Sequence, residues 1–114
     1  MQKSKQLELS NNIDTLLANS RVILQICNQN LDTLENISKV SEIFADNEEC
    51  IQVINSIKQD DIDIYNSIML EKAKAIAEIL DINKHVVECI NRKKNKIAEQ
   101  LKDVSQKKNL LIYK

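Results

Sequence analysis

The stretch that decides the fold is residues 76–90, which read IAEILDINKHVVECI. Its apolar residues recur at spacings of three and four, which is the period of an amphipathic α-helix and not the alternation of a strand. The same spacing continues in both directions, from Leu9 to Leu111. The 114 residues include neither glycine nor proline, which argues against tight hairpins and excludes glycine-rich phosphate loops. We therefore expect an all-α fold.

Two short polar segments divide the apolar pattern. Asp46 and Glu49 have the spacing of a capping box, in which a cap residue and an acid three positions later satisfy the first backbone N–H groups. Residues 81–84, Asp-Ile-Asn-Lys, supply two further capping residues. These boundaries predict helices near 5–44, 47–80 and 83–110. We expect an antiparallel up-down-up bundle of three long helices, forming a single domain over residues 1–114.

Two weaker interruptions lie inside these predicted helices. Residues 28–30, Asn-Gln-Asn, weaken the first helix, because asparagine side chains compete for its backbone hydrogen bonds. We expect that helix to continue with a kink, although Asp32 and Glu35 have the spacing of a fresh helix start. Residues 59–61 are a similar dent in the second helix, which indicates another kink.

A heptad row supports a rival arrangement. Positions seven apart are apolar with one exception, and they read Ile62, Met69, Ile76, Asn83, Ile90, Ile97, Val104 and Leu111. This row predicts a helical hairpin containing one helix of about fifty residues, with a coiled-coil seam whose register Asn83 sets. In a coiled-coil oligomer, the row would meet its copy in another subunit.

Charge is distributed unevenly along the chain. Residues 31–83 hold twelve acids and four bases, whereas residues 84–114 hold nine bases and three acids. We expect the two segments to attract each other within the fold. The basic run from Arg92 to Lys96 lacks the interleaved aromatic residues that stack on bases, so we expect no nucleic-acid partner.

Residues that carry chemistry are few and scattered. His85 and Cys89 would share a helix face, but a zinc site needs further ligands, such as Cys27 or Cys50, from other helices. The acids of residues 60–63 lack the glycine and the terminal glutamate of a calcium loop. We expect no catalytic residue, no metal and no cofactor. Three cysteines without a CxxC pair, and no apolar run of membrane-spanning length, indicate a cytoplasmic protein without membrane insertion.

Two stretches resemble the small flagellar export chaperones of the FliT and FlgN type. Residues 30–37, Asn-Leu-Asp-Thr-Leu-Glu-Asn-Ile, are similar to the acidic, leucine-containing segment between that family's early helices. Residues 105–109, followed by Tyr113, are similar to a lysine-rich tail that closes in tyrosine. Members of the family are short all-helical proteins with long antiparallel helices.

The resemblance implies a non-enzymatic chaperone. It would bind a helical segment of a flagellar subunit in an apolar groove between bundle helices and keep that subunit soluble and competent for export. The last helix would cover the groove until the client displaces it. The apolar end of the chain either completes the core or contacts the partner. The expected partner-binding residues are Leu101, Val104, Leu110, Leu111, Ile112 and Tyr113. The alternative function is a coiled-coil oligomeric scaffold or another protein–protein interaction module.

Overall fold

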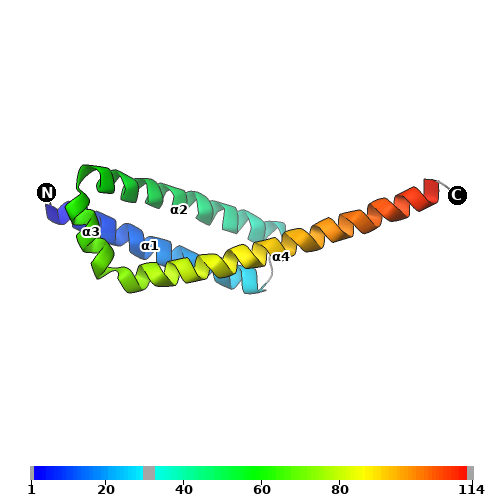
Figure 1. The fold of residues 1–114 in the computed structure, drawn as a ribbon, viewed down its shortest axis with the longest axis horizontal. Coiled ribbons are helices and arrows are strands. Elements are labelled where there is room, and N and C mark those ends of the chain that lie inside the picture. Colours follow the sequence, from blue (N-terminus) through cyan, green and yellow to red (C-terminus); the bar gives the residue numbers. More distant parts are fainter. Residues whose placement is uncertain (1, 30–32, 113–114) are drawn as a thin grey trace.

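A computed structural model describes residues 2–29 and 33–112, with side chains described for residues 4–29, 33–96 and 99. This part of the chain contains four helices, α1 (Gln2–Gln29), α2 (Leu34–Asp60), α3 (Ile62–Glu71) and α4 (Ala73–Ile112). Figure 1 shows α1 and α4 running in the same direction, with α2 opposite to both and the short α3 at one end. The all-helical prediction is confirmed for these residues, but with four helices in place of three.

The predicted continuous first helix, 5–44, is wrong. α1 ends at Gln29, and Thr33 caps a new helix with extended backbone angles (φ −83°, ψ 144°). The Thr33 hydroxyl accepts a hydrogen bond from the backbone N–H of Asn36 at 3.2 Å, which satisfies one of the otherwise unpaired N–H groups of the first turn. Glu35 adds a favourable negative charge in this first turn. The fresh start that Asp32 suggested is therefore real, with Thr33 as its cap.

The predicted boundary between residues 44 and 47 is also wrong, because α2 passes through it without interruption. The side chain of Asn47 has a tertiary partner, since its Oδ1 accepts a hydrogen bond from Asn19 Nδ2 of α1 at 2.9 Å. On either side of this contact, Val40 and Cys50 are buried. The apolar face of the helix therefore continues across a segment whose residue types also suit a cap.

The dent at residues 59–61 is a true helix boundary and not a kink. The N–H of Asp61 donates to the Ile57 carbonyl at 2.8 Å, which closes the end of α2. The carboxylate of Asp61 accepts a hydrogen bond from the N–H of Ile64 at 3.2 Å, which caps the start of α3. One aspartate therefore ends one helix and begins the next.

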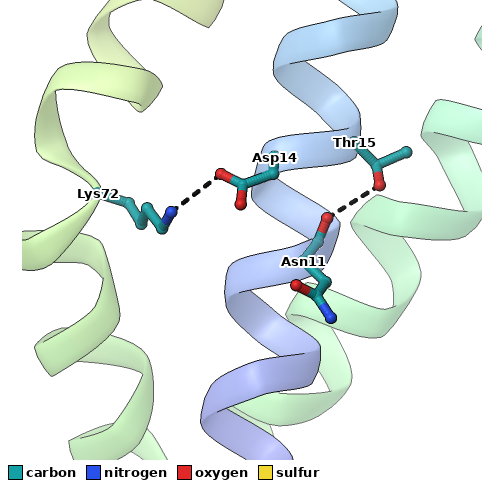
Figure 2. A network of polar contacts seen from close by, with 4 residues as sticks. All are labelled: Asn11, Asp14, Thr15 and Lys72. Atoms are coloured by element: carbon teal, nitrogen blue, oxygen red, sulfur yellow. Dashed lines mark hydrogen bonds and ion pairs between the residues drawn. The ribbon is translucent and has the colours of Figure 1, made fainter.

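A second break, at Lys72, had no counterpart among the predictions. The N–H of Lys72 donates to the Ile68 carbonyl at 2.8 Å, and the Lys72 carbonyl accepts from the N–H of Ile76 at 2.9 Å. Its ammonium group reaches Asp14 of α1 at 3.0 Å, as Figure 2 shows. In the same figure the Thr15 hydroxyl donates to the Asn11 carbonyl at 2.9 Å, one turn earlier in α1.

The turn predicted at residues 81–84 is wrong, because α4 continues through it as part of a 40-residue helix. Ile82 is buried in the middle of this segment, and burial of this residue opposes a break there. The single helix of about fifty residues from Ile62 is wrong as well, because the break at Lys72 removes its first turns. The break leaves residues 73–112 as one helix.

The core consists of two clusters along α1. One lies where α1, α3 and the end of α2 meet, and its buried members are Leu9, Ile13, Ile57, Ile64 and Ile68. The other joins α1, α2 and α4, and its buried members are Ile23, Cys27, Val40, Ile82, Val86 and Cys89. Met69 is partly buried and packs against the first cluster. Burial of these side chains holds the helices together, since each large one contributes about 1.5–3 kcal/mol.

Ion pairs between helices lie on the exposed surface of this assembly. Arg21 Nη2 lies 2.7 Å from Glu78 Oε2, and the Lys72–Asp14 pair lies at the start of α4. Both pairs join α1 to the region around the start of α4. Neither pair joins residues 31–83 to residues 84–114, so the attraction predicted between those segments stays a prediction.

Candidate protein-interaction surface

The second half of α4 projects beyond the other helices. Cys89 packs near Cys27, two residues before the end of α1, and Figure 1 shows α4 continuing well past this level. Residues 97–112 therefore extend about 24 Å from the bundle, at 1.5 Å per residue. The described structure is 74 Å long and about 25 Å wide, which reflects this projection.

The predicted partner-binding residues fall on this projecting segment. Leu101, Val104, Leu110, Leu111 and Ile112 lie within the backbone of α4, although their side chains are outside the described part of the structure. Tyr113 lies outside the described residues altogether. The described backbone of this segment lies beyond α1 and α2, so in this structure it does not cover a surface of its own bundle (Figure 1).

α2 carries a row of large apolar side chains on its surface. Ile37, Phe44 and Ile51 follow one another at heptad spacing, and they are 47%, 44% and 48% exposed. Single exposed apolar residues are ordinary, but a row of this kind on one helix face marks a candidate interaction site. These residues are not among the predicted partner-binding residues, although their spacing of seven is visible in the sequence.

α4 carries a similar row in its first half. Leu80 and Val87 are exposed, also seven residues apart, and Ile90 is half-buried beside them. Leu80 and Val87 lie four residues after Ile76 and Asn83, which are members of the heptad row predicted to form a coiled-coil seam. The structure therefore places this part of the seam at the surface of the protein.

Helix register brings the two rows to one side of the molecule. On α2, Asn47 faces α1, Val40 lies in the shared core, and Phe44 lies about 40° further round the helix. Around the circumference of α4, Glu78 faces α1 and Val86 lies next, in the same core cluster. The exposed row of Leu80 and Val87 follows on the far side of Val86. Both rows therefore flank the shared core on the side away from α1.

We call this surface the α2–α4 face. It is defined by Ile37, Phe44, Ile51, Leu80, Val87 and Ile90. Of the exposed acids of α2, Glu48 lies beside the row, whereas Glu35, Glu42, Asp46 and Glu49 lie on the opposite side of the helix. Lys39 offsets part of this charge through its 3.6 Å contact with Glu35.

A separate depression of about 570 Å³ lies at the end of α1. Its lining combines two thiols with basic side chains, and comprises Cys27, Asn28, Gln29, Cys89, Arg92, Lys93 and Lys96. The Cys89 thiol donates to the Cys27 carbonyl at 3.4 Å. Burial, with a smaller contribution from Cys89, raises the pKa of Cys27 to about 11. At neutral pH the Cys27 thiol is therefore protonated, which makes it a poor nucleophile and a poor metal ligand.

The basic side chains around this depression have a structural explanation. α1 has no basic residue in its last turn, and its final carbonyl groups carry a partial negative charge. Arg92, Lys93 and Lys96 of α4 lie beside that helix end and are suited to offset this charge. Cys27 and Cys89 are 62 positions apart, so their contact depends on how α4 packs against α1.

The remaining candidate sites do not assemble. His85 is exposed, and its Nδ1 lies 2.8 Å from the Asp81 carbonyl within the same helix. Asp61 is engaged in capping, as described above. Across the described residues, no three metal-ligating side chains come together. Nor does any helix in the described part combine the length and the apolar character needed to cross a membrane.

Comparison of the chain with family models, with curated proteins and with solved structures finds no match.

Proposed function

We propose that this chain is a non-enzymatic protein-binding module that recognises a helical client segment through the projecting end of α4. The observation that carries the proposal is the continuation of α4 for about 24 Å past the bundle as a single helix. Apolar residues continue along it at helical spacing through Ile97, Leu101, Val104 and Leu111. A client helix that packs against such a strip loses apolar surface that would otherwise drive its aggregation.

The narrower form of this proposal is a cytoplasmic chaperone for a flagellar export substrate. It rests on the resemblance of residues 30–37 and 105–113 to the FliT and FlgN type. In this proposal α1, α2 and α4 form an up-down-up scaffold, and the client contacts Leu101, Val104, Leu110, Leu111, Ile112 and Tyr113. The client makes its contacts by surface fit, with no bond made or broken.

Deletion of residues 105–114 tests the proposal. The probes are synthetic peptides covering the C-terminal helical regions of the flagellar subunits encoded in the same genome, and binding is followed by fluorescence anisotropy. We expect at least one peptide to bind the full chain, and the truncated chain to bind it at least tenfold more weakly. Circular dichroism checks that the truncated chain keeps its helices. Equal affinity of the two chains would refute the assignment of the site.

A pull-down from the native cell extends the test to clients outside the flagellum. Recovery of a helical partner that depends on residues 105–114, with none of the flagellar peptides bound, would keep the binding module and overturn the flagellar assignment. Failure of the truncation to reduce any recovered interaction would overturn both.

A further inference from the structure

We propose that Cys27 and Cys89 form a redox-active pair, which closes to a disulfide by exchange with an anionic low-molecular-weight disulfide. The two cysteines come from different helices, α1 and α4, and belong to the same core cluster. The Cys89 sulfur lies 3.4 Å from the carbonyl oxygen of Cys27, so it already contacts the backbone of its partner residue. This inference does not rest on the proposed function.

The side chains of the two cysteines also approach each other. Burial is the main cause of the raised pKa of Cys27, and the charge of Cys89 and a hydrogen bond with its side chain add to it. This proximity is compatible with a disulfide, which joins residues whose Cα atoms are about 4.4–6.8 Å apart. The third cysteine, Cys50, lies on α2 and is not a member of the cluster.

The depression at the end of α1 gives a reagent access to the pair. Both cysteines line it, although the residues themselves are only 6% and 8% exposed. Its volume of about 570 Å³ lies within the range of small-molecule sites, about 300–1,000 Å³. Cys50 is equally buried but is not among the residues that line the depression.

Charge identifies the class of reagent. Arg92, Lys93 and Lys96 line the depression, and none of its described lining residues carries a carboxylate. The end of α1 offsets only about half an elementary charge, so these side chains leave the depression positive. Glutathione disulfide carries more carboxylates than ammonium groups and is attracted to such a site, whereas the cationic disulfide cystamine is repelled.

The exchange takes two steps. The Cys89 thiolate attacks one sulfur of the reagent, which breaks the reagent's S–S bond, forms a mixed disulfide and releases one thiolate. Cys27 then gives up its proton and attacks the Cys89 sulfur, which displaces the second thiolate. The two protein thiols lose two electrons and two protons, and the reagent gains them to become two thiols. The first attack falls to Cys89 because the Cys27 thiol is protonated at neutral pH.

The disulfide would join the end of α1 to α4 at the level where α4 leaves the bundle (Figure 1). Because the two side chains are already adjacent, closure requires no rearrangement of the helices. Circular dichroism of the oxidised chain should therefore match that of the reduced chain. A loss of helical signal on oxidation would contradict a pair that is preformed in the fold.

Mapping of the disulfide tests the pairing. The reduced full chain is incubated with glutathione disulfide, the remaining thiols are alkylated, and the linked peptides are identified by mass spectrometry. We expect the Cys27–Cys89 link to exceed either link to Cys50 at least tenfold. In concentrated urea the two links to Cys50 should dominate instead, because they close shorter loops. The same distribution in the folded and unfolded chains would overturn the inference.

Single cysteine variants test the order of the steps. Cys27→Ala should stop at a glutathione adduct on Cys89, whereas Cys89→Ala should slow modification of Cys27 at least tenfold. Cys50→Ala is the matched control and should leave the rate of closure unchanged. Circular dichroism checks that each variant is folded, and the mapping of the unaltered chain decides the pairing without them. In the unaltered chain, an adduct on Cys89 that never closes, or reaction at Cys50 first, would overturn the inference.

The charge of the depression is tested by comparing two reagents. Arg92→Gln with Lys96→Gln should slow the reaction with glutathione disulfide at least threefold and should not slow the reaction with cystamine. Lys84→Gln is the control, since Lys84 is exposed on the same helix and is not among the lining residues. If the double variant reacts with glutathione disulfide as fast as the unaltered chain does, the assignment of an anionic reagent is wrong.

Discussion

Asn19 of α1 donates a hydrogen bond from its Nδ2 to Oδ1 of Asn47 in α2, at 2.9 Å in a partly buried position. The two residues are 28 positions apart, and the bond fixes the register of the antiparallel pair midway along both helices. It also accounts for an asparagine inside α2. An asparagine side chain that is engaged across the interface does not compete for the hydrogen bonds of its own backbone.

We expect Asn47→Ala to lower the free energy of unfolding by about 1–2 kcal/mol, because it leaves the Asn19 amide partly buried without its partner. Urea unfolding followed by circular dichroism measures the change. Asn55→Ala is the control, since Asn55 is exposed on the same helix and should change stability by less than about 0.5 kcal/mol. An equal effect of the two substitutions would show that the interhelical bond is not the cause.

The apolar period established the helical class because it runs through the whole chain, but it could not place the boundaries. Capping residues such as Asp46 and Asn83 look alike whether they end a helix or face solvent in its middle. Whether α2 ends or continues at Asn47 depends on the hydrogen-bond partner of its side chain in another helix. At Lys72 both neighbouring segments are helical in pattern, and only the packed structure shows that the chain turns there.

Thr33 offers a direct test of the first boundary. Thr33→Ala removes the hydroxyl that accepts from Asn36 N–H, and we expect a loss of about 1 kcal/mol in the free energy of unfolding. Thr33→Ser keeps the oxygen and should retain most of that stability. Ser38→Ala, at an exposed position one turn later, is the matched control and should be nearly neutral. If Thr33→Ser loses as much as Thr33→Ala, the capping bond does not stabilise α2.

The sequence pattern predicts only part of the candidate surface. The partner-binding residues were predicted in the projecting end of α4 because its apolar residues are visible in the sequence. The row of Ile37, Phe44 and Ile51 was not recognised, because exposure depends on which side of α2 faces α1. That choice rests on contacts such as Asn19–Asn47, which follow from packing and not from local pattern.

The Cys27 thiol makes the free energy of unfolding depend on pH in the alkaline range. Its pKa is raised from 9.0 to about 11 by burial first and by Cys89 second, so the folded chain keeps a proton that the unfolded chain releases. The resulting stabilisation is fully present below pH 9 and is lost as the pH rises towards 11. We expect the free energy of unfolding to fall over this range under reducing conditions.

Cys27→Ala isolates the contribution of this thiol. The variant is expected to be less stable at pH 8, because it leaves a small cavity, but its stability should fall less steeply between pH 9 and 11. The steepness of the decline is the diagnostic quantity, measured by urea unfolding at several pH values. Parallel curves for the variant and the unaltered chain would contradict the assignment.

The Lys72–Asp14 ion pair joins α1 to the break between α3 and α4, with 3.0 Å between Nζ and Oδ1. The Asp14 side chain is half exposed. Solvent screening and the ordering of a long lysine side chain both reduce the value of such a pair. A double-mutant cycle with Asp14→Ala and Lys72→Met should give a coupling of about 0.2–1 kcal/mol, and 1 M NaCl should reduce it. The Arg21–Glu78 pair, with both partners exposed, provides a comparison and should fall in the same range. A coupling above about 2 kcal/mol that persists at high salt would mean that the break at Lys72 depends on this ion pair, and not on the buried contacts of Ile64 and Ile68.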